Sequence, residues 1–291
     1  MIQFKKVAFH TFGCKLNFSE TSTISRLFEN AGMAKVSLDD YPDIFVVNTC
    51  SVTENADKRC KQLVRKVKRI NPECFVVIIG CFAQLKPNEI AEIEGVDMVL
   101  GANEKFNIIE HIENLNDLHP EKTHVSYDSI KKTKDFIPSF SIGDRTRSFL
   151  KIQDGCDYFC TFCTIPLARG KSRNSSIHET IQEALKIAKT SVKEVVLTGV
   201  NIGDFGQGKD ENFYELIQEL DKISGIDRFR ISSIEPNLLS DEIIKFCLTK
   251  AKKFAPHFHI PLQSGNDQML KAMRRKYDTA LYKDRIKHIK E

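Results

Sequence analysis

The residues best placed to do chemistry are three cysteines in one short run, Cys156, Cys160 and Cys163, which we call the loop triad. Three and then two residues separate them, so three thiolates share one compact loop. Such a loop suits an iron-sulfur cubane, and three ligands leave one iron open to bind a substrate. Zinc is the rival, since two to four residues between ligands is also normal there. The missing fourth ligand and the position directly after a predicted strand favour a catalytic redox cluster.

A second set of three cysteines, Cys14, Cys50 and Cys81, is spread along the first hundred residues, and we call it the dispersed triad. Each cysteine lies just past the carboxyl end of a predicted strand. In an open parallel sheet those loops converge at one edge, so three distant thiolates could meet there around a ligand. Gly13 and Gly80 would let the backbone turn sharply beside a bulky cluster. Three buried apolar cysteines would show the same placement, and the residues alone leave both interpretations open.

The remaining three cysteines have no such arrangement. Cys60 lies on the apolar stripe of a predicted helix, Cys247 lies among apolar residues, and Cys74 has no partner at metal-ligand spacing. We expect these three to be structural. A cytosolic chain keeps its cysteines reduced, and nine is an odd number, so metal binding explains the two triads better than disulfides do.

These loops must be positioned by predicted strands, which are short apolar runs, and by the segments that follow them, whose apolar residues have the spacing of a helix. The runs 7–9, 44–47 and 75–79 are each followed by such a segment, which is the βαβ pattern. We therefore expect an α/β domain with an open parallel sheet at residues 1–114, with a fourth strand at 97–100. Its helices are predicted at 19–30, 55–70 and 88–94, and Gly32 and the Asn71-Pro72 pair end the first two.

The second half of the chain repeats the β/α alternation. Residues 115–145 are polar, with scattered Ser, Pro and Lys, and are predicted to be a linker. In the second domain, 146–291, strands are predicted at 149–153, 194–200, 228–233 and 257–262, separated by helical stretches such as 177–189. Four β/α units fill only part of a TIM-like barrel, whose eight-strand version needs about 250 residues. We therefore expect a partial barrel that is incomplete at its C-terminus.

Composition and charge indicate a soluble two-domain protein of 291 residues, with 41% hydrophobic and 28% charged residues. No apolar stretch approaches membrane-spanning length and the first ten residues lack the pattern of a secretory signal, so we expect a cytoplasmic protein with no membrane contact. The net charge of +4 neither requires nor excludes a nucleic-acid partner. A monomer is expected.

Taken together, these motifs resemble the radical S-adenosylmethionine (SAM) methylthiotransferases. The C-x3-C-x2-C run of the loop triad is the signature of the radical-SAM superfamily, and the resemblance covers essentially all 291 residues. It implies that the dispersed triad holds an auxiliary 4Fe-4S cluster and that the loop triad holds the 4Fe-4S cluster that binds and cleaves SAM. The N-terminal segments that carry it are Gly13-Cys14-Lys15-Leu16-Asn17, Asn48-Thr49-Cys50-Ser51-Val52-Thr53 and Gly80-Cys81-Phe82-Ala83-Gln84.

The resemblance also implies a reaction. An electron from a donor such as flavodoxin or ferredoxin cleaves SAM to a 5′-deoxyadenosyl radical, which abstracts hydrogen from an unactivated C-H bond. Sulfur associated with the auxiliary cluster is methylated by another SAM and delivered to the resulting carbon, which gives a methylthio group. Cofactors carry this chemistry, while the protein positions them and tunes their surroundings.

Three substrates are known in the family: isopentenyladenosine in tRNA, threonylcarbamoyladenosine in tRNA, and an aspartate of a ribosomal protein. The start Cys14-Lys15-Leu16-Asn17 and the stretch 165–170 look most like the threonylcarbamoyladenosine group. This implies a tRNA partner that is modified next to the anticodon. Relatives continue through the rest of the barrel into a small β-rich RNA-binding domain, which this sequence does not include.

Several residues of the second domain are candidates for SAM contacts. Gly199 and Asn201, after the second barrel strand, resemble the glycine-containing stretch that contacts the methionine end of SAM, although an ordinary tight turn would look similar. Ser233 and Glu235, after the third strand, could hydrogen-bond the ribose hydroxyls, or could simply cap the strand. A further matching stretch, 261–265, has no assigned role.

Two groups of cations are candidates for substrate contacts. Arg169, Lys171 and Arg173 follow the loop triad and could bind a carboxylate or phosphate through charge-assisted hydrogen bonds. A threonylcarbamoyl group carries a carboxylate that an isopentenyl group lacks, so a cation here would discriminate between them. A solvated basic face is the alternative. The other group is a possible RNA-facing surface on the helix at 55–70, and consists of Lys58, Arg59, Lys61, Arg65, Lys66, Lys68 and Arg69.

A hypothesis of another class uses the same residues. In it, both triads bind zinc structurally and the basic helix contacts phosphates, which gives a zinc-stabilised RNA-binding protein without catalysis. The colour of the protein separates the two, because thiolate-bound iron-sulfur clusters absorb visible light whereas zinc does not.

Overall fold

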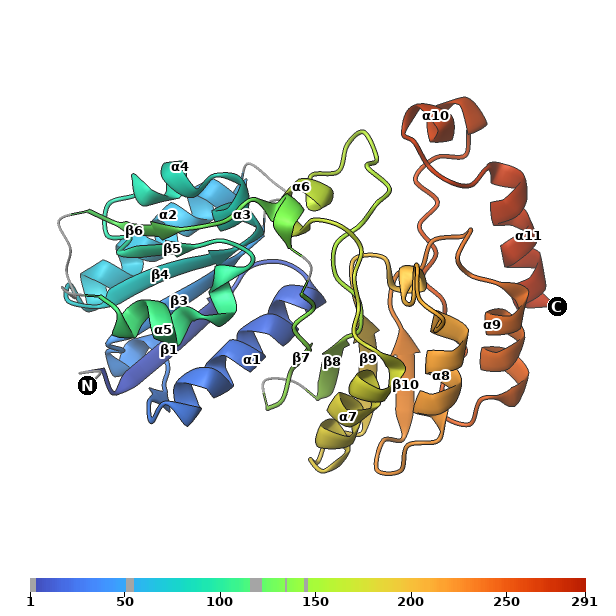
Figure 1. Cartoon of the computed structure of the whole chain (residues 1–291), viewed down its shortest axis with the longest axis horizontal. Coiled ribbons are helices and arrows are strands. Elements are labelled where there is room, and N and C mark those ends of the chain that lie inside the picture. Colours follow the sequence, from blue (N-terminus) through green and yellow to red (C-terminus); the bar gives the residue numbers. More distant parts are fainter. Residues whose placement is uncertain (1–3, 51–54, 116–121, 134, 144–145) are drawn as a thin grey trace. The chain divides into compact units, whose positions relative to one another are not determined.

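The computed structural model describes residues 4–50, 55–115, 122–133, 135–143 and 146–291. The chain divides into two compact units. The first comprises Met1–Thr133 together with Leu167–Arg169, and the second comprises Lys134–Pro166 together with Gly170–Glu291. Each unit is an α/β structure with its own sheet (Figure 1).

The first unit contains a six-stranded parallel sheet in the order β2-β1-β3-β4-β5-β6. All side chains of β3 and β4 are buried, and adjacent residues of β4 belong to different apolar clusters, with Val76 and Ile78 on one face and Val77 and Ile79 on the other. Both faces are therefore covered, as in parallel sheets generally. The strands are β1 (Lys6–Thr11), β2 (Ala34–Lys35), β3 (Ile44–Thr49), β4 (Phe75–Gly80), β5 (Met98–Leu100) and β6 (His124–Ser126).

Helices cover the two faces of this sheet. One apolar cluster contains Ile24 and Phe28 of α1 and Ile108 of α5, while the other contains Cys60 and Val64 of α2. Figure 1 shows the same arrangement, with α1 and α5 on one side of the strands and α2, α3 and α4 on the other. The helices are α1 (Lys15–Asn30), α2 (Asn55–Ile70), α3 (Cys81–Leu85), α4 (Pro87–Ala91) and α5 (Ile108–Glu113), with short 3-10 turns at Leu38–Asp40, Glu104–Phe106 and Ile130–Lys132.

The second unit contains a four-stranded sheet in the order β10-β9-β8-β7, with β8, β9 and β10 parallel and β7 antiparallel to β8. Helices α7, α8 and α9 bury their apolar residues in one cluster with the strands, including Ile187, Leu216 and Ile243. Capping boxes at Ser176 and Asn212 begin α7 and α8. The strands are β7 (Ser139–Phe140), β8 (Arg147–Lys151), β9 (Glu194–Thr198) and β10 (Arg228–Ile231). The helices are α7 (Ile177–Ala188), α8 (Phe213–Asp221), α9 (Asp241–Lys245), α10 (Asp267–Ala272) and α11 (Thr279–Lys290), with a 3-10 turn at Ile202–Asp204 and a π turn at Phe246–Lys250. Helix α6 (Ile165–Arg169) is divided between the two units, because its residues Leu167–Arg169 belong to the first.

The predicted fold class is confirmed: an open parallel-sheet unit is followed by a unit with the β/α alternation of a partial barrel. The prediction of a fourth barrel strand at 257–262 is wrong. Only Ser233 and His259 form an isolated bridge there. Half of this segment is exposed, and Pro261 has no N-H for a ladder, so its apolar residues do not make it a strand.

The segment 115–145, predicted to be a linker, contains β6 of the first sheet and β7 of the second. Both are edge strands of two or three residues, too short for a periodic pattern to reveal. Residues 116–121, 134 and 144–145 of the predicted linker lie outside the described residues, as do Ser51, Val52 and Thr53 of the family motif. Within the described part of the chain, no helix combines the length and apolar character that crossing a membrane requires.

Candidate functional site

The dispersed triad follows three neighbouring strands. Cys14 precedes α1 after β1, Cys50 follows β3, and Cys81 begins α3 after β4, and these strands are adjacent in the order β1-β3-β4. Their carboxyl ends therefore meet at one edge of the sheet. Gly13 has a φ of +115°, and a Cβ there would lie 2.7 Å from the Cβ of Cys50. Only glycine allows so close an approach at this positive φ.

Asn17 ties these loops together. Its Nδ2 donates to the backbone oxygens of Phe12, at 3.1 Å, and Thr49, at 3.0 Å. Its Oδ1 accepts a weaker hydrogen bond from the Cys14 thiol at 3.6 Å. Because Asn17 is fully buried, this side chain holds the loops after β1 and β3 in a defined arrangement around the cysteines.

A buried ionic network lies next to Cys81. Glu20 is fully buried, and its carboxylate pairs with Lys105 at 2.7 Å and with Arg169 at 3.0 Å. Arg169 also donates through Nη2 to Asn17 Oδ1 at 2.7 Å and through Nε to Cys81 Sγ at 3.2 Å. Burial raises the pKa of the Cys81 thiol, while Arg169 and Lys105 act in the opposite direction. Two cations face one carboxylate, so a Cys81 thiolate, the form that binds metal, would balance the charge.

The loop triad lies on the turn that follows β8. Gly155 has a φ of +71°, and a Cβ there would lie 1.9 Å from the backbone oxygen of Lys171, so the turn requires glycine. The Cys156 N-H donates to the Gly170 oxygen at 3.0 Å, and the Cys163 N-H donates to the Cys160 oxygen at 3.0 Å. Cys160 is buried, and Cys156 and Cys163 are partly exposed. The loop thus presents three thiols from a backbone that is hydrogen-bonded at both ends.

Burial and nearby charges act on the thiols of the loop triad as they do on Cys81. Burial raises the pKa of Cys156 to about 11, and Asp204 and the other two thiols of the triad contribute in the same direction. When thiols in such an environment bind a metal, their protons are released to solvent. Arg275 places a cation beside Cys160, because its Nη1 donates to Cys160 Sγ at 3.2 Å. Its Nη2 pairs with Glu235.

Among the described residues, neither triad has its three thiols as close together as a single zinc ion requires. Three thiolates on one tetrahedral zinc, with Zn-S bonds of about 2.3 Å, lie roughly 3.8 Å apart. Among the described residues, the one group whose ligand atoms all lie within 4.8 Å of one another contains Asp241, Asp284 and His288, and no cysteine. Three thiols are the protein ligands of a 4Fe-4S cluster with one open iron, so the chemistry of each triad fits such a cluster.

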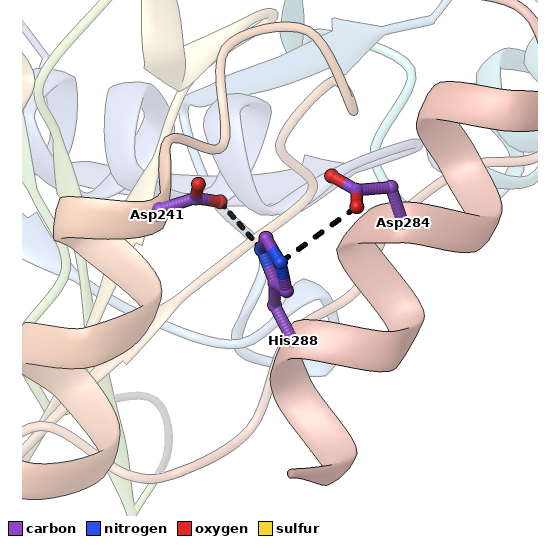
Figure 2. Close-up of side chains that lie close together, drawn as sticks. All are labelled: Asp241, Asp284 and His288. Carbon is purple, nitrogen blue, oxygen red and sulfur yellow. Dashed lines mark hydrogen bonds and ion pairs between the residues drawn. The ribbon is translucent and has the colours of Figure 1, made fainter.

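The group of Asp241, Asp284 and His288 is an ionic link between α9 and α11 (Figure 2). His288 Nδ1 lies 2.8 Å from Asp241 Oδ1, and its Nε2 lies 3.7 Å from Asp284 Oδ1. Arg285 also pairs with Asp241. Both carboxylates are exposed and already have cationic or imidazole partners, so we assign this group to helix packing.

The predicted SAM contacts after β9 lie on a turn that is held by hydrogen bonds from its backbone to Gln153. Gln153 Oε1 accepts the N-H groups of Val200, at 2.9 Å, and Asn201, at 2.8 Å. A Cβ on Gly199 would lie 2.9 Å from the Gln153 oxygen. Asn201 is buried, its Nδ2 donates to Asp204 Oδ2 at 2.8 Å, and its Oδ1 has no hydrogen-bond partner among the described residues. Such an acceptor fits a ligand that donates a hydrogen bond.

The predicted contacts after β10 already have protein partners. Ser233 Oγ lies 2.7 Å from His259 Nδ1, and Glu235 pairs with Arg275. Nearby, a cavity of about 390 Å³ is lined by Tyr158, Asp204 and Asn237, among others. Burial raises the pKa of Asp204 to about 6, so this carboxyl changes its charge close to neutral pH. A polar cavity with a perturbed carboxyl is typical of a binding site.

The three cations predicted to contact the substrate have different surroundings. Arg169 belongs to the buried network around Cys81, so its guanidinium is not on a surface that a substrate reaches. Arg173 donates to the Asp135 oxygen at 2.9 Å and pairs with Asp154 at 3.2 Å. Lys171 is exposed. Of the three, Lys171 is thus the cation most open to a ligand.

Sequence reasoning did not identify Tyr158, Asp204, Asn237 and Arg275. The first three lie on the loops after β8, β9 and β10, and polar residues at the carboxyl ends of barrel strands are the signal that could have indicated them. Arg275 follows α10 in a turn, where no local pattern distinguishes it from the exposed Arg274 beside it.

Two known families match the chain, one over most of the first unit and one over most of the second. Residues 6–101 match the family described as Uncharacterized protein family UPF0004, and residues 150–291 match the Radical SAM superfamily. The chain is 41% identical to threonylcarbamoyladenosine tRNA methylthiotransferase MtaB of Bacillus subtilis strain 168, over 98% of this chain and 63% of that protein. It is 37% identical to the protein of the same name from Aquifex aeolicus strain VF5, over 98% of this chain and 70% of that protein.

Among solved structures, the fold resembles the radical S-adenosylmethionine methyltransferase TsrM from Kitasatospora setae, solved with tryptophan substrate and a SAM analogue bound. The TM-score is 0.70, with 12% identity, over 98% of this chain and 65% of that one. At this identity the likeness concerns the fold alone. The chain spans 63% of the length of the B. subtilis relative.

Proposed function

The chain belongs to the radical-SAM methylthiotransferase family, in the group of the MtaB enzymes, and from this premise we propose that it adds a methylthio group to N6-threonylcarbamoyladenosine next to the anticodon of tRNA. The observation that carries the proposal is the pair of cysteine triads, each on loops at the carboxyl ends of parallel strands. In an α/β structure this is the edge at which ligands bind.

We assign a 4Fe-4S cluster that binds SAM to the loop triad and an auxiliary 4Fe-4S cluster to the dispersed triad. When bound, the first cluster would supply the electron that splits SAM into methionine and a 5′-deoxyadenosyl radical, and this radical would remove a hydrogen atom from the substrate. The auxiliary cluster would supply the sulfur, methylated by a second SAM, that is delivered to the resulting carbon. The electron comes from a donor such as flavodoxin or ferredoxin.

The residues of the chain bind and orient these groups. Asn201 Oδ1, a buried acceptor without a partner among the described residues, would accept a hydrogen bond from the ammonium group of SAM, and Asp204 accepts from Nδ2 and so fixes the orientation of the amide. Gly199 keeps the backbone close to Gln153, which leaves the turn compact. Ser233, which contacts His259, and Glu235, which pairs with Arg275, lie after the next strand and would hydrogen-bond the ribose hydroxyls of bound SAM.

Recognition of the substrate requires a cation for the threonyl carboxylate, and the exposed Lys171 supports this assignment better than the engaged Arg173 does. The names of relatives with 34 to 41% identity support the same substrate. The site acts in the cytoplasm, where tRNA is modified, and the chain works as a monomer.

The substrate assignment is tested by offering three acceptors. The anaerobically reconstituted chain is incubated with SAM, a reductant and either tRNA containing threonylcarbamoyladenosine, tRNA containing isopentenyladenosine, or the ribosomal protein. We expect mass spectrometry of the digested products to show the methylthio group on threonylcarbamoyladenosine. Preferential turnover of isopentenyladenosine or of the protein aspartate would refute the substrate while leaving the radical-SAM assignment intact.

We propose that the exposed face of α2 binds the tRNA backbone. Lys58, Arg65 and Arg69 lie along this face and are all exposed, and the cations Arg59 and Lys66 contribute to a lowered pKa of His10, after the larger effect of burial. Lys68 is not part of the face, because it pairs with Asp97 at 3.0 Å. Anionic backbones bind such faces through release of counterions.

Changing Lys58, Arg65 and Arg69 together to Gln is expected to weaken tRNA binding. The slope of log affinity against log salt concentration should decrease by about 2 to 3, because each phosphate contact contributes roughly 0.7 to 0.9. Filter binding at several salt concentrations measures it. The matched control changes Lys186, Lys189 and Lys193, three exposed lysines of the second unit, to Gln. Equal effects of the two triple changes would show that only net charge matters.

A further inference from the structure

Arg275 connects a cysteine of the loop triad to a carboxylate after β10. Its side chain is only 5% exposed. One terminal nitrogen, Nη1, donates to Cys160 Sγ at 3.2 Å, and the other, Nη2, pairs with Glu235. A single guanidinium thus bridges a thiol and a carboxylate within the second unit.

The backbone and an aromatic ring hold this guanidinium in place. Arg275 N-H donates to the Leu270 oxygen at 2.9 Å, which closes the turn after α10. The guanidinium carbon lies 5.3 Å from the centre of the Tyr277 ring. The Tyr277 hydroxyl donates to the Pro261 oxygen at 2.8 Å, so the ring itself is anchored. The position of the charge is therefore defined by contacts on three sides.

We propose that Arg275 is a positioning residue that raises the reduction potential of the cluster on the loop triad, and that Glu235 moderates this effect. The inference rests on the proposed function, since it assumes that this cluster is present. A cationic donor to a ligand sulfur stabilises negative charge there, and reduction adds negative charge to the cluster. The carboxylate of Glu235, bound to the same guanidinium, partly cancels that charge.

A purely structural role for Arg275 would have different consequences. If the guanidinium only held the turn after α10, its replacement would lower stability and leave the potential of the cluster unchanged. If Glu235 served only as a ribose contact, its neutralisation would affect SAM binding and leave the potential in the absence of SAM unchanged. The two substitutions shift the potential in opposite directions only when both charges act on the cluster.

The test measures the potential in protein that carries one cluster. In a background in which Cys14, Cys50 and Cys81 are Ala, the reconstituted chain is titrated without SAM and the reduced cluster is followed by electron paramagnetic resonance. Arg275→Met should lower the ratio of reduced to oxidised cluster at a fixed ambient potential by about tenfold, equivalent to about 59 mV for one electron. Glu235→Gln should raise this ratio. Arg275→Lys, which keeps the charge, should remain between Arg275→Met and the parent.

The matched control is Arg274→Gln, which removes an exposed positive charge from the neighbouring residue and should leave the potential unchanged because solvent screens that charge. Unchanged potentials in both Arg275→Met and Glu235→Gln, at full iron content, would overturn the inference alone. If Arg275→Met loses its iron, the direction of the shift in Glu235→Gln decides. A parent chain that takes up no iron would overturn this inference together with the proposed function.

Discussion

Replacing Cys156, Cys160 and Cys163 together by Ala is expected to remove about four irons from each reconstituted chain and to abolish the formation of 5′-deoxyadenosine. These thiols are the three donors on the loop after β8, and without them no open iron is available to bind SAM. Iron analysis of the purified protein and chromatography of the products after reduction with dithionite measure the two effects.

The matched variant replaces Cys14, Cys50 and Cys81 by Ala. It should lose a similar amount of iron but keep some reductive cleavage of SAM, because these cysteines lie in the first unit, on loops of the other sheet. Cys247→Ala removes a buried thiol of the apolar core and should retain all the iron. Equal loss of SAM cleavage in the two triple variants would contradict this division of labour, and a colourless parent with zinc and no iron would favour the RNA-binding alternative.

A second large effect is expected for Glu20→Ala, on stability. Glu20 is fully buried between Lys105 and Arg169, so its removal leaves two cations in the interior without their carboxylate. Breaking a buried pair in this way costs about 3–5 kcal/mol, because the remaining charges keep their desolvation penalty. Urea unfolding of the whole chain, followed by circular dichroism, should therefore show a much lower midpoint for the transition that includes the first unit.

The control for this change is Glu29→Ala on the same helix, where the carboxylate is exposed. It should alter the free energy of unfolding by less than about 0.5 kcal/mol. A similar midpoint for Glu20→Ala and Glu29→Ala would show that the buried network contributes nothing to stability. Iron bound to the dispersed triad should also decrease in Glu20→Ala, since Arg169 would no longer be held beside Cys81.

Local patterns predicted those elements whose environment is uniform along their length. The central strands β3 and β4 are buried on both faces, so a continuous apolar run identifies them. Helix α2 has a clear apolar stripe, and its predicted bounds agree with the structure. The edge strands β2, β6 and β7 have two or three residues and no such run, which is why they were not predicted.

The candidate site was predictable only where chemistry is concentrated in sequence. The loop triad is a local motif, whereas the role of Arg169 depends on Glu20, a partner 149 residues away. Arg169 follows the loop triad closely in the sequence, where a positive charge is typical of a substrate contact. Only the tertiary structure reveals that its side chain is buried. Arg275 is similar, since Cys160 lies 115 residues before it.

The assignment of Leu167–Arg169 to the first unit affects the order in which that unit is completed during synthesis. A ribosome releases the chain from the N-terminus, so the strands of the first sheet emerge well before Arg169. Until then Glu20 has Lys105 as its cationic partner, and Cys81 lacks the guanidinium that donates to it. A fragment that ends at residue 133 has the same deficiency permanently. The first unit is thus discontinuous in sequence, and its cysteine site reaches its final form only after the loop triad has also been translated.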